Sequence, residues 1–120
     1  KTKREIKKEI TDRFGYNLER TVESIRPGYG FDISCQGTVP EAIICFLDSS
    51  SWEDAIRNAI SLGGDSDTLA CITGAIGEAF YGSVSRSIRD TVKRTLSDEL
   101  WEIAERFTSI YCRGRKENSP

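Results

Sequence analysis

Two aspartates and a threonine, Asp65, Asp67 and Thr68, stand directly after a pair of glycines in the segment GGDSDT. Two carboxylates that are two residues apart repel each other unless a cation lies between them. Carboxylate and hydroxyl oxygens are hard ligands, of the kind that Mg²⁺, Mn²⁺ and Ca²⁺ bind. The segment is therefore a candidate metal site. A simpler interpretation stays open, in which one aspartate caps the next helix and the other is solvated.

Two other known uses of paired aspartates do not fit this segment. An EF-hand loop needs D-x-D-x-D-G and a later glutamate, and neither is present. Phosphatases of the haloacid-dehalogenase type place D-x-D-x-T or D-x-D-x-V after a hydrophobic strand. Here the threonine comes one place too early, and a Gly-Gly turn precedes the aspartates instead of a strand.

The cysteines argue against other metal and nucleophile chemistry. They stand at positions 35, 45, 71 and 112, no two are spaced C-x-x-C, and the chain has no histidine. A zinc site or a Cys–His nucleophile is therefore not expected. Cys45 and Cys71 lie in apolar stretches and are predicted to be small buried hydrophobes. This usage is typical of a reduced, cytoplasmic protein.

The charge pattern does not favour a nucleic acid or a membrane as partner. The formal net charge is −2, and a nucleic-acid partner would favour a basic chain. The basic cluster within residues 1–8 is interrupted by Glu5 and is predicted to be a solvated helix face. No apolar run approaches the ~20 residues that a membrane span needs. The chain has no methionine and opens in a helical pattern at Lys1, so we expect it to be part of a longer polypeptide.

The apolar residues recur with helical spacing in the first half of the chain, and no segment is predicted to be a strand. A first helix ends at Gly15, residues 17–25 form a second short helix, and residues 27–37 form a glycine-rich loop. A capping box at residues 38–41, with Pro40 in the first turn, is expected to begin the next helix. The first helix carries a narrow apolar stripe of Ile6, Ile10 and Phe14.

The helix that contains residues 42–47 has no polar face there and is predicted to be central and buried. Residues 50–53 offer a second capping box. It precedes an amphipathic helix that Gly63 and Gly64 end in left-handed conformations. The apolar face of that helix consists of Trp52, Ala55, Ile56, Ala59 and Ile60.

Small residues dominate the next predicted helix, residues 66–81, which includes Gly74 and Gly77. Because a glycine inside a helix costs roughly 1 kcal/mol relative to alanine, we expect another backbone or a ligand to approach closely. Residues 85–95 form a further helix, and Ser97 caps the last one. The apolar face of the last helix consists of Leu100, Ile103, Ala104, Phe107 and Ile110.

A longer stretch resembles a known family. Residues 35–82, CQGTVPEAIICFLDSSSWEDAIRNAISLGGDSDTLACITGAIGEAFYG, are similar to the C-terminal signature of the ADP-ribosylglycohydrolase family, which includes the dinitrogenase reductase-activating glycohydrolases. The segments RTVESIRPGYGFDISCQ before it and LSDELWEIAERF after it also fit. The resemblance implies an all-α fold, a compact orthogonal helical bundle. Residues 1–112 would be the C-terminal part of that domain, and residues 113–120 a flexible tail.

The resemblance also implies a chemistry and a set of residues. Family members hold two Mg²⁺ or Mn²⁺ ions and remove ADP-ribose from protein side chains, or cleave related ADP-ribosyl bonds. The family's C-terminal metal ligands fall on Asp65, Asp67 and Thr68, with Asp67 the better candidate to bridge the two metals. The loop at residues 31–35 matches the region that lines the ADP-ribose cleft. The implied substrate-binding positions are Ile33, Ser34, Gly63 and Gly64.

One family feature is missing from these 120 residues. The N-terminal half of family members carries a second metal cluster, Thr-Asp-Asp, together with the acidic residues that act on water or substrate. Here Thr11-Asp12 is followed by Arg13. We therefore expect no catalytic acid or base in this segment, the N-terminal half of the fold as its partner, and no turnover by the segment alone. The alternative is a non-enzymatic helical protein on the same scaffold, with a structural or binding role.

Overall fold

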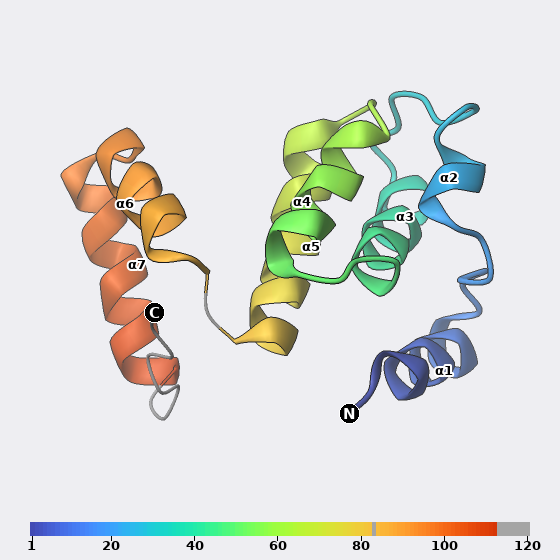
Figure 1. Cartoon of the computed structure of the whole chain (residues 1–120), viewed down its shortest axis with the longest axis horizontal. Coiled ribbons are helices and arrows are strands. Elements are labelled where there is room, and N and C mark those ends of the chain that lie inside the picture. The colour runs from blue at the N-terminus through green and yellow to red at the C-terminus, as the bar shows by residue number, and fades with distance from the viewer. Residues whose placement is uncertain (83, 113–120) are drawn as a thin grey trace. The chain divides into compact units, whose positions relative to one another are not determined.

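The computed structural model describes residues 1–82 and 84–112, and every regular element in them is a helix (Figure 1). The all-α prediction is therefore confirmed. None of the helices in these ranges is long and apolar enough to cross a membrane. The predicted tail at residues 113–120 lies outside the described residues. The helices are α1 (Lys3–Phe14), α2 (Val22–Ile25), α3 (Cys35–Leu47), α4 (Trp52–Ser61), α5 (Ser66–Tyr81), α6 (Arg86–Thr95) and α7 (Asp98–Tyr111).

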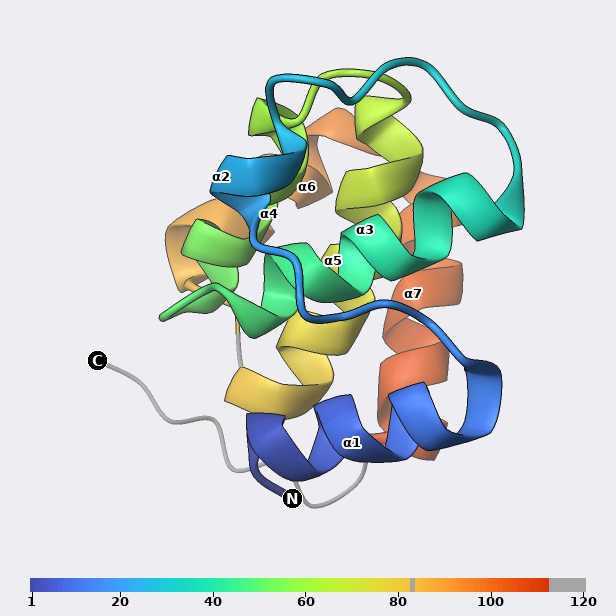
Figure 2. The same cartoon turned by 90° about the vertical axis from the view of Figure 1, so that its right-hand side faces the viewer.

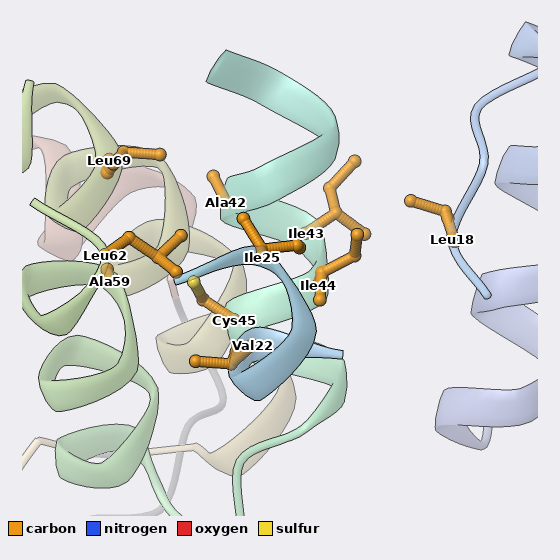
Figure 3. Close-up of a cluster of buried hydrophobic side chains, with 10 residues drawn as sticks. All are labelled: Leu18, Val22, Ile25, Ala42, Ile43, Ile44, Cys45, Ala59, Leu62 and Leu69. Atoms are coloured by element: carbon orange, nitrogen blue, oxygen red, sulfur yellow. The ribbon is translucent and has the colours of Figure 1, made fainter. Parts of the chain in front are cut away.

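The chain divides into two compact units, Lys1–Tyr81 and Gly82–Pro120. In the first unit, α3 packs against α2, α4 and α5, and Figure 2 shows it crossing α5. As predicted, residues 42–46 are buried, whereas Leu47 at the end of α3 is half-buried. The apolar core consists of Leu18, Val22, Ile25, Ala42, Ile43, Ile44, Cys45, Ala59, Leu62 and Leu69 (Figure 3).

The start of α3 differs from the prediction. The helix begins at Cys35, and its N-cap is Ser34, whose hydroxyl oxygen accepts the Gly37 N–H at 3.0 Å. Pro40 therefore lies inside the helix rather than in its first turn. The Thr38 hydroxyl, predicted to cap the helix, donates instead to the Asp32 carbonyl at 3.1 Å. Both Ser34 and Thr38 could cap a helix. Because the Thr38 hydroxyl is engaged by the loop, Ser34 serves as the cap and the helix starts earlier.

Two other boundaries also shift. The second helix spans only Val22–Ile25, because Thr21 and Ser24 form a reciprocal capping box that starts it late. The N-cap of α4 is Ser51 rather than Ser50, and its hydroxyl accepts the Asp54 N–H at 3.1 Å. Local capping signals thus locate these helices correctly but leave their first residue open to competition between neighbouring caps.

Helix α1 ends at Gly15, which has a left-handed φ of 68°, as predicted. None of its residues is buried. Lys3 connects it to the rest of the unit by hydrogen bonds. The Lys3 ammonium donates to the carbonyls of Phe46 at 2.9 Å, Leu47 at 3.1 Å and Ser49. It also lies 5.0 Å from the centre of the Phe46 ring. The prediction of a uniformly solvated basic face is wrong at this residue, because a cation here satisfies the C-terminal carbonyls of α3.

The glycines of α5 make room for α4. The Trp52 indole donates its N–H to the Gly74 carbonyl at 3.0 Å. A Cβ on Gly77 would lie 3.2 Å from the indole ring, and one on Gly74 would lie 3.0 Å from Ile56. A close approach was predicted correctly, but the neighbours are side chains of α4 rather than a backbone or a ligand. On α4 itself, Ala55 and Ala59 are buried whereas Ile60 is 55% exposed, so the predicted apolar face is narrower than expected.

The second unit contains α6 and α7 as predicted, with Ser97 capping α7. The ring of Trp101 lies under the side chains of Arg89, at 5.6 Å, and Lys93, at 5.4 Å, which join the two helices by cation–π contacts. The large apolar residues of the predicted α7 face are each more than half exposed; they are Leu100, Ile103, Phe107 and Ile110.

The cysteines divide by burial. Cys45 is fully buried as predicted, but Cys71 is exposed, because it falls on the side of α5 away from the core residues Leu69 and Thr73. Burial raises the pKa of the Cys45 thiol to about 12. Alkylation proceeds through the thiolate. The raised pKa lowers the thiolate fraction of Cys45 at a given pH, so Cys45 should react slowly.

We expect iodoacetamide at pH 8.5 to modify Cys35 and Cys71, both exposed, at least about a hundredfold faster than Cys45. The sites are identified by peptide mass spectrometry at timed intervals. Cys45 should react at the rate of the others only in denaturant. Equal rates in the native protein would show that Cys45 is not held in the core.

Candidate metal centre and substrate loop

The GGDSDT turn joins two packed helices. Helix α4 ends at Ser61, and Gly63 and Gly64 follow with φ values of 76° and 65°. Both values lie in the left-handed region, where a residue with a side chain is strained. The predicted left-handed conformation of the two glycines is confirmed. The turn delivers Asp65 to the start of α5.

The two aspartates lie at the N-terminal end of α5. Asp65 is half-buried, and Asp67 and Thr68 are exposed. The Asp67 carboxylate accepts the Thr68 N–H at 3.0 Å. Hydrogen bonding with the Asp65 side chain and then with the Thr68 backbone lowers the pKa of Asp67 below its ordinary value. The helix N-terminus favours an anionic carboxyl group at this place, and a cation between the two carboxylates would offset their repulsion.

The donor set fits one side of a hard-cation site. It consists of two carboxylates and one hydroxyl, which is the oxygen chemistry that Mg²⁺ and Mn²⁺ select. Among residues 1–82 and 84–112, no three His, Cys, Asp or Glu side chains are grouped so that they could hold a metal ion. Since an octahedral ion takes about six ligands, the other oxygens would come from water, substrate or a further protein segment.

The glycine-rich loop that carries the predicted substrate segment, residues 31–35, contacts this turn through Tyr29 and Gly30, just before that segment. A Cβ on Gly64 would lie 2.8 Å from the Gly30 carbonyl oxygen and 2.8 Å from the Tyr29 ring. The loop therefore contacts the turn where no side chain intervenes. Beyond this contact, Phe31 and Ile33 are 74% and 83% exposed. The structure thus brings the loop that carries Ile33 and the turn that carries Asp65 into one region of the first unit.

The remaining predicted substrate positions have structural roles. The Ser34 hydroxyl caps α3, so this side chain is already engaged. Gly63 and Gly64 supply the left-handed turn, and at Gly63 a Cβ would meet open space. At these three residues only the backbone, or the Ser34 hydroxyl as a donor, is available to a ligand.

Sequence reasoning missed the role of Asp32. Its carboxylate accepts the Ser34 N–H at 2.7 Å, and hydrogen bonds from the Ser34 side chain and backbone lower the pKa of Asp32. The sequence did contain the signal, because an aspartate two residues before a turn residue favours this local hydrogen bond.

An ion pair between a buried carboxylate and a more exposed arginine was also missed. Arg20 and Glu41 are 2.7 Å apart, and the Glu41 side chain is 7% exposed. Glu41 was predicted to complete a capping box, but it pairs with Arg20 because the helix starts earlier. Its second carboxylate oxygen is buried without a hydrogen-bond partner in the structure.

Comparison with known proteins identifies the family. The model of the ADP-ribosylglycohydrolase family matches residues 2–117. The chain belongs to the ADP-ribosylglycohydrolase family. It is 31% identical over 116 residues to the zebrafish (Danio rerio) protein named ADP-ribosylhydrolase ARH3, an alignment that covers 88% of this chain and 30% of the relative.

Two further relatives of this chain are also matched over only a small part of their own length. The human (Homo sapiens) ADP-ribosylhydrolase ARH3 is 35% identical over 85 residues, 62% of this chain and 22% of the relative. An uncharacterized protein of Archaeoglobus fulgidus is 31% identical over 93 residues, 77% of this chain and 28% of the relative. The chain thus spans less than a third of the length of these relatives. No solved structure matches it significantly.

Proposed function

We propose that this chain supplies one side of the metal and substrate site of a hydrolase that removes ADP-ribose from modified protein side chains or from related ADP-ribosyl compounds. The observation that carries the proposal is the contact of Gly64 with Tyr29 and Gly30, which lie in the same loop as Ile33. It brings the apolar surface proposed for the substrate and the oxygen donors proposed for the metal together in one unit. Family membership supports the same reaction class.

The residues take separate roles in this proposal. Asp65, Asp67 and Thr68 are the metal ligands, and the lowered pKa of Asp67 keeps it anionic. Bound Mg²⁺ or Mn²⁺ ions would orient the ribose hydroxyls and activate water. Ile33 contacts the substrate, with the Ser34 hydroxyl and the backbone of Gly63 and Gly64 beside it.

Departure of the leaving group from the ribose anomeric carbon builds positive charge on the sugar, as in glycoside cleavage. The residues of this chain hold the metal and substrate rather than move the proton. We propose that the acid or base, and the ligands that complete a two-metal site, come from the N-terminal half of the fold. The four cysteines of this chain are free thiols, which supports a reducing, cytoplasmic setting.

The test is calorimetric titration of ADP-ribose into the chain with Mn²⁺, with Mg²⁺ and with EDTA. We expect saturable binding that requires the divalent cation, and no release of ADP-ribose from an ADP-ribosylated protein by the chain alone. Binding of equal strength in EDTA would remove the metal from the proposal. Absence of binding under all three conditions would contradict the proposed function and favour a non-enzymatic role.

A further inference from the structure

The loop that carries Ile33 is shaped by a small hydrogen-bonded network. The Asp32 carboxylate accepts the Ser34 N–H at 2.7 Å, and the Asp32 carbonyl accepts the Thr38 hydroxyl at 3.1 Å. The Ser34 hydroxyl in turn accepts the Gly37 N–H at 3.0 Å. Asp32 is thus bonded to two residues that follow Ile33: to Ser34, the N-cap of α3, and to Thr38 in the first turn of that helix.

Helix α3 leaves a space for this carboxylate. A Cβ built on Gly37 would collide with the Asp32 side chain, so the missing side chain at residue 37 is what allows the carboxylate to lie against the helix. Ile33 itself is 83% exposed. Because so little of its side chain is in contact, the direction in which it projects depends on the backbone that Asp32 holds.

From this geometry we infer that Asp32 is a positioning residue: its carboxylate, seated over Gly37, holds the loop so that Ile33 meets the ADP-ribose. The inference rests on the proposed function, since it takes Ile33 as a substrate contact. Asp32 acts through the loop and not as a further metal ligand. Its carboxylate is already engaged by Ser34, and in the described residues it belongs to no group of three metal-binding side chains.

The first test compares Asp32→Ala and Asp32→Asn in the whole chain. Ordering a loop side chain on binding costs free energy, so we expect Asp32→Ala to weaken ADP-ribose binding about tenfold in the presence of Mn²⁺. Asp32→Asn keeps an oxygen acceptor for the Ser34 N–H and should lose only about threefold. Asp90→Ala, which removes an exposed aspartate from α6, is the matched control and should bind like the wild type.

A second readout does not depend on the ligand. Amide hydrogen exchange at Ser34, measured by NMR, should accelerate about tenfold in Asp32→Ala, because the acceptor of that N–H is lost. Unchanged exchange at Ser34 would overturn the inference even without an ADP-ribose measurement.

Gly37→Ala supplies an independent test, because it expels the carboxylate without removing it. We expect Gly37→Ala to weaken ADP-ribose binding about as much as Asp32→Ala, and the double variant to be no weaker than either. If both single variants bind like the wild type, the inference is wrong while the proposed function stands. If the wild type does not bind, the proposed function fails first. If the double variant shows the sum of the two losses, residue 37 acts by some route other than Asp32.

Discussion

Replacing Asp67 with asparagine is expected to abolish the proposed metal-dependent release of ADP-ribose while leaving the fold intact. Asparagine keeps the size of the side chain and an oxygen that accepts the Thr68 N–H. The free energy of unfolding should therefore change by less than about 1 kcal/mol. The substitution removes the negative charge and the second anionic oxygen proposed to bridge two cations. Loss of the metal should raise the activation barrier by several kcal/mol, a loss of at least about a hundredfold in rate.

The matched control is Ser66→Ala, one residue away on the same turn. Its hydroxyl donates to the Gly63 carbonyl at 3.3 Å, so its removal costs one exposed hydrogen bond and no proposed ligand. Metal affinity is measured by calorimetric Mn²⁺ titration of both variants. Turnover is measured on an ADP-ribosylated protein, in an enzyme preparation that contains this chain and is active as wild type. If Asp67→Asn binds Mn²⁺ and turns over like the wild type, the aspartates are only helix caps.

Truncating Phe46 to alanine is expected to lower the free energy of unfolding of the first unit by about 3–5 kcal/mol. Phe46 is fully buried on α3. Its ring meets Phe80 edge-on at 5.1 Å and Tyr81 at 6.2 Å, and the Lys3 ammonium lies 5.0 Å from it. The substitution therefore opens a cavity between α3 and α5 and weakens the contact that holds α1. Such a loss is a large fraction of the stability of a small domain.

Urea unfolding followed by circular dichroism measures this effect. Phe107→Ala on α7 is the control, because Phe107 is 59% exposed and its loss creates no enclosed cavity. We expect the control to change the free energy of unfolding by less than about 1 kcal/mol. Equal effects of the two substitutions would mean that α3 is not the centre of the core.

Residues close together in the sequence were sufficient to predict the helix and the turn that form the candidate metal site. Gly63 and Gly64 have positive φ values because only glycine adopts that conformation without strain, and this can be predicted from their identity alone. The α5 bounds, 66–81, follow from that turn and from the small residues after it. Asp65, Asp67 and Thr68 lie together for the same local reason. Their role as metal ligands stays a prediction.

Contacts beyond adjacent residues, some within one loop and others between helices, decided the rest. Whether α3 begins after Ser34 or Thr38 depended on the Thr38 hydroxyl reaching the Asp32 carbonyl. The glycines of α5 indicated a close neighbour, but only packing identified it as Trp52. Local sequence predicts which conformations a segment tolerates. It does not determine which of several possible partners each polar group bonds, or which side chain fills each space between helices. The competition among these partners is resolved when helices pack, and here it placed Tyr29 and Gly30, in the same loop as Ile33, against Gly64.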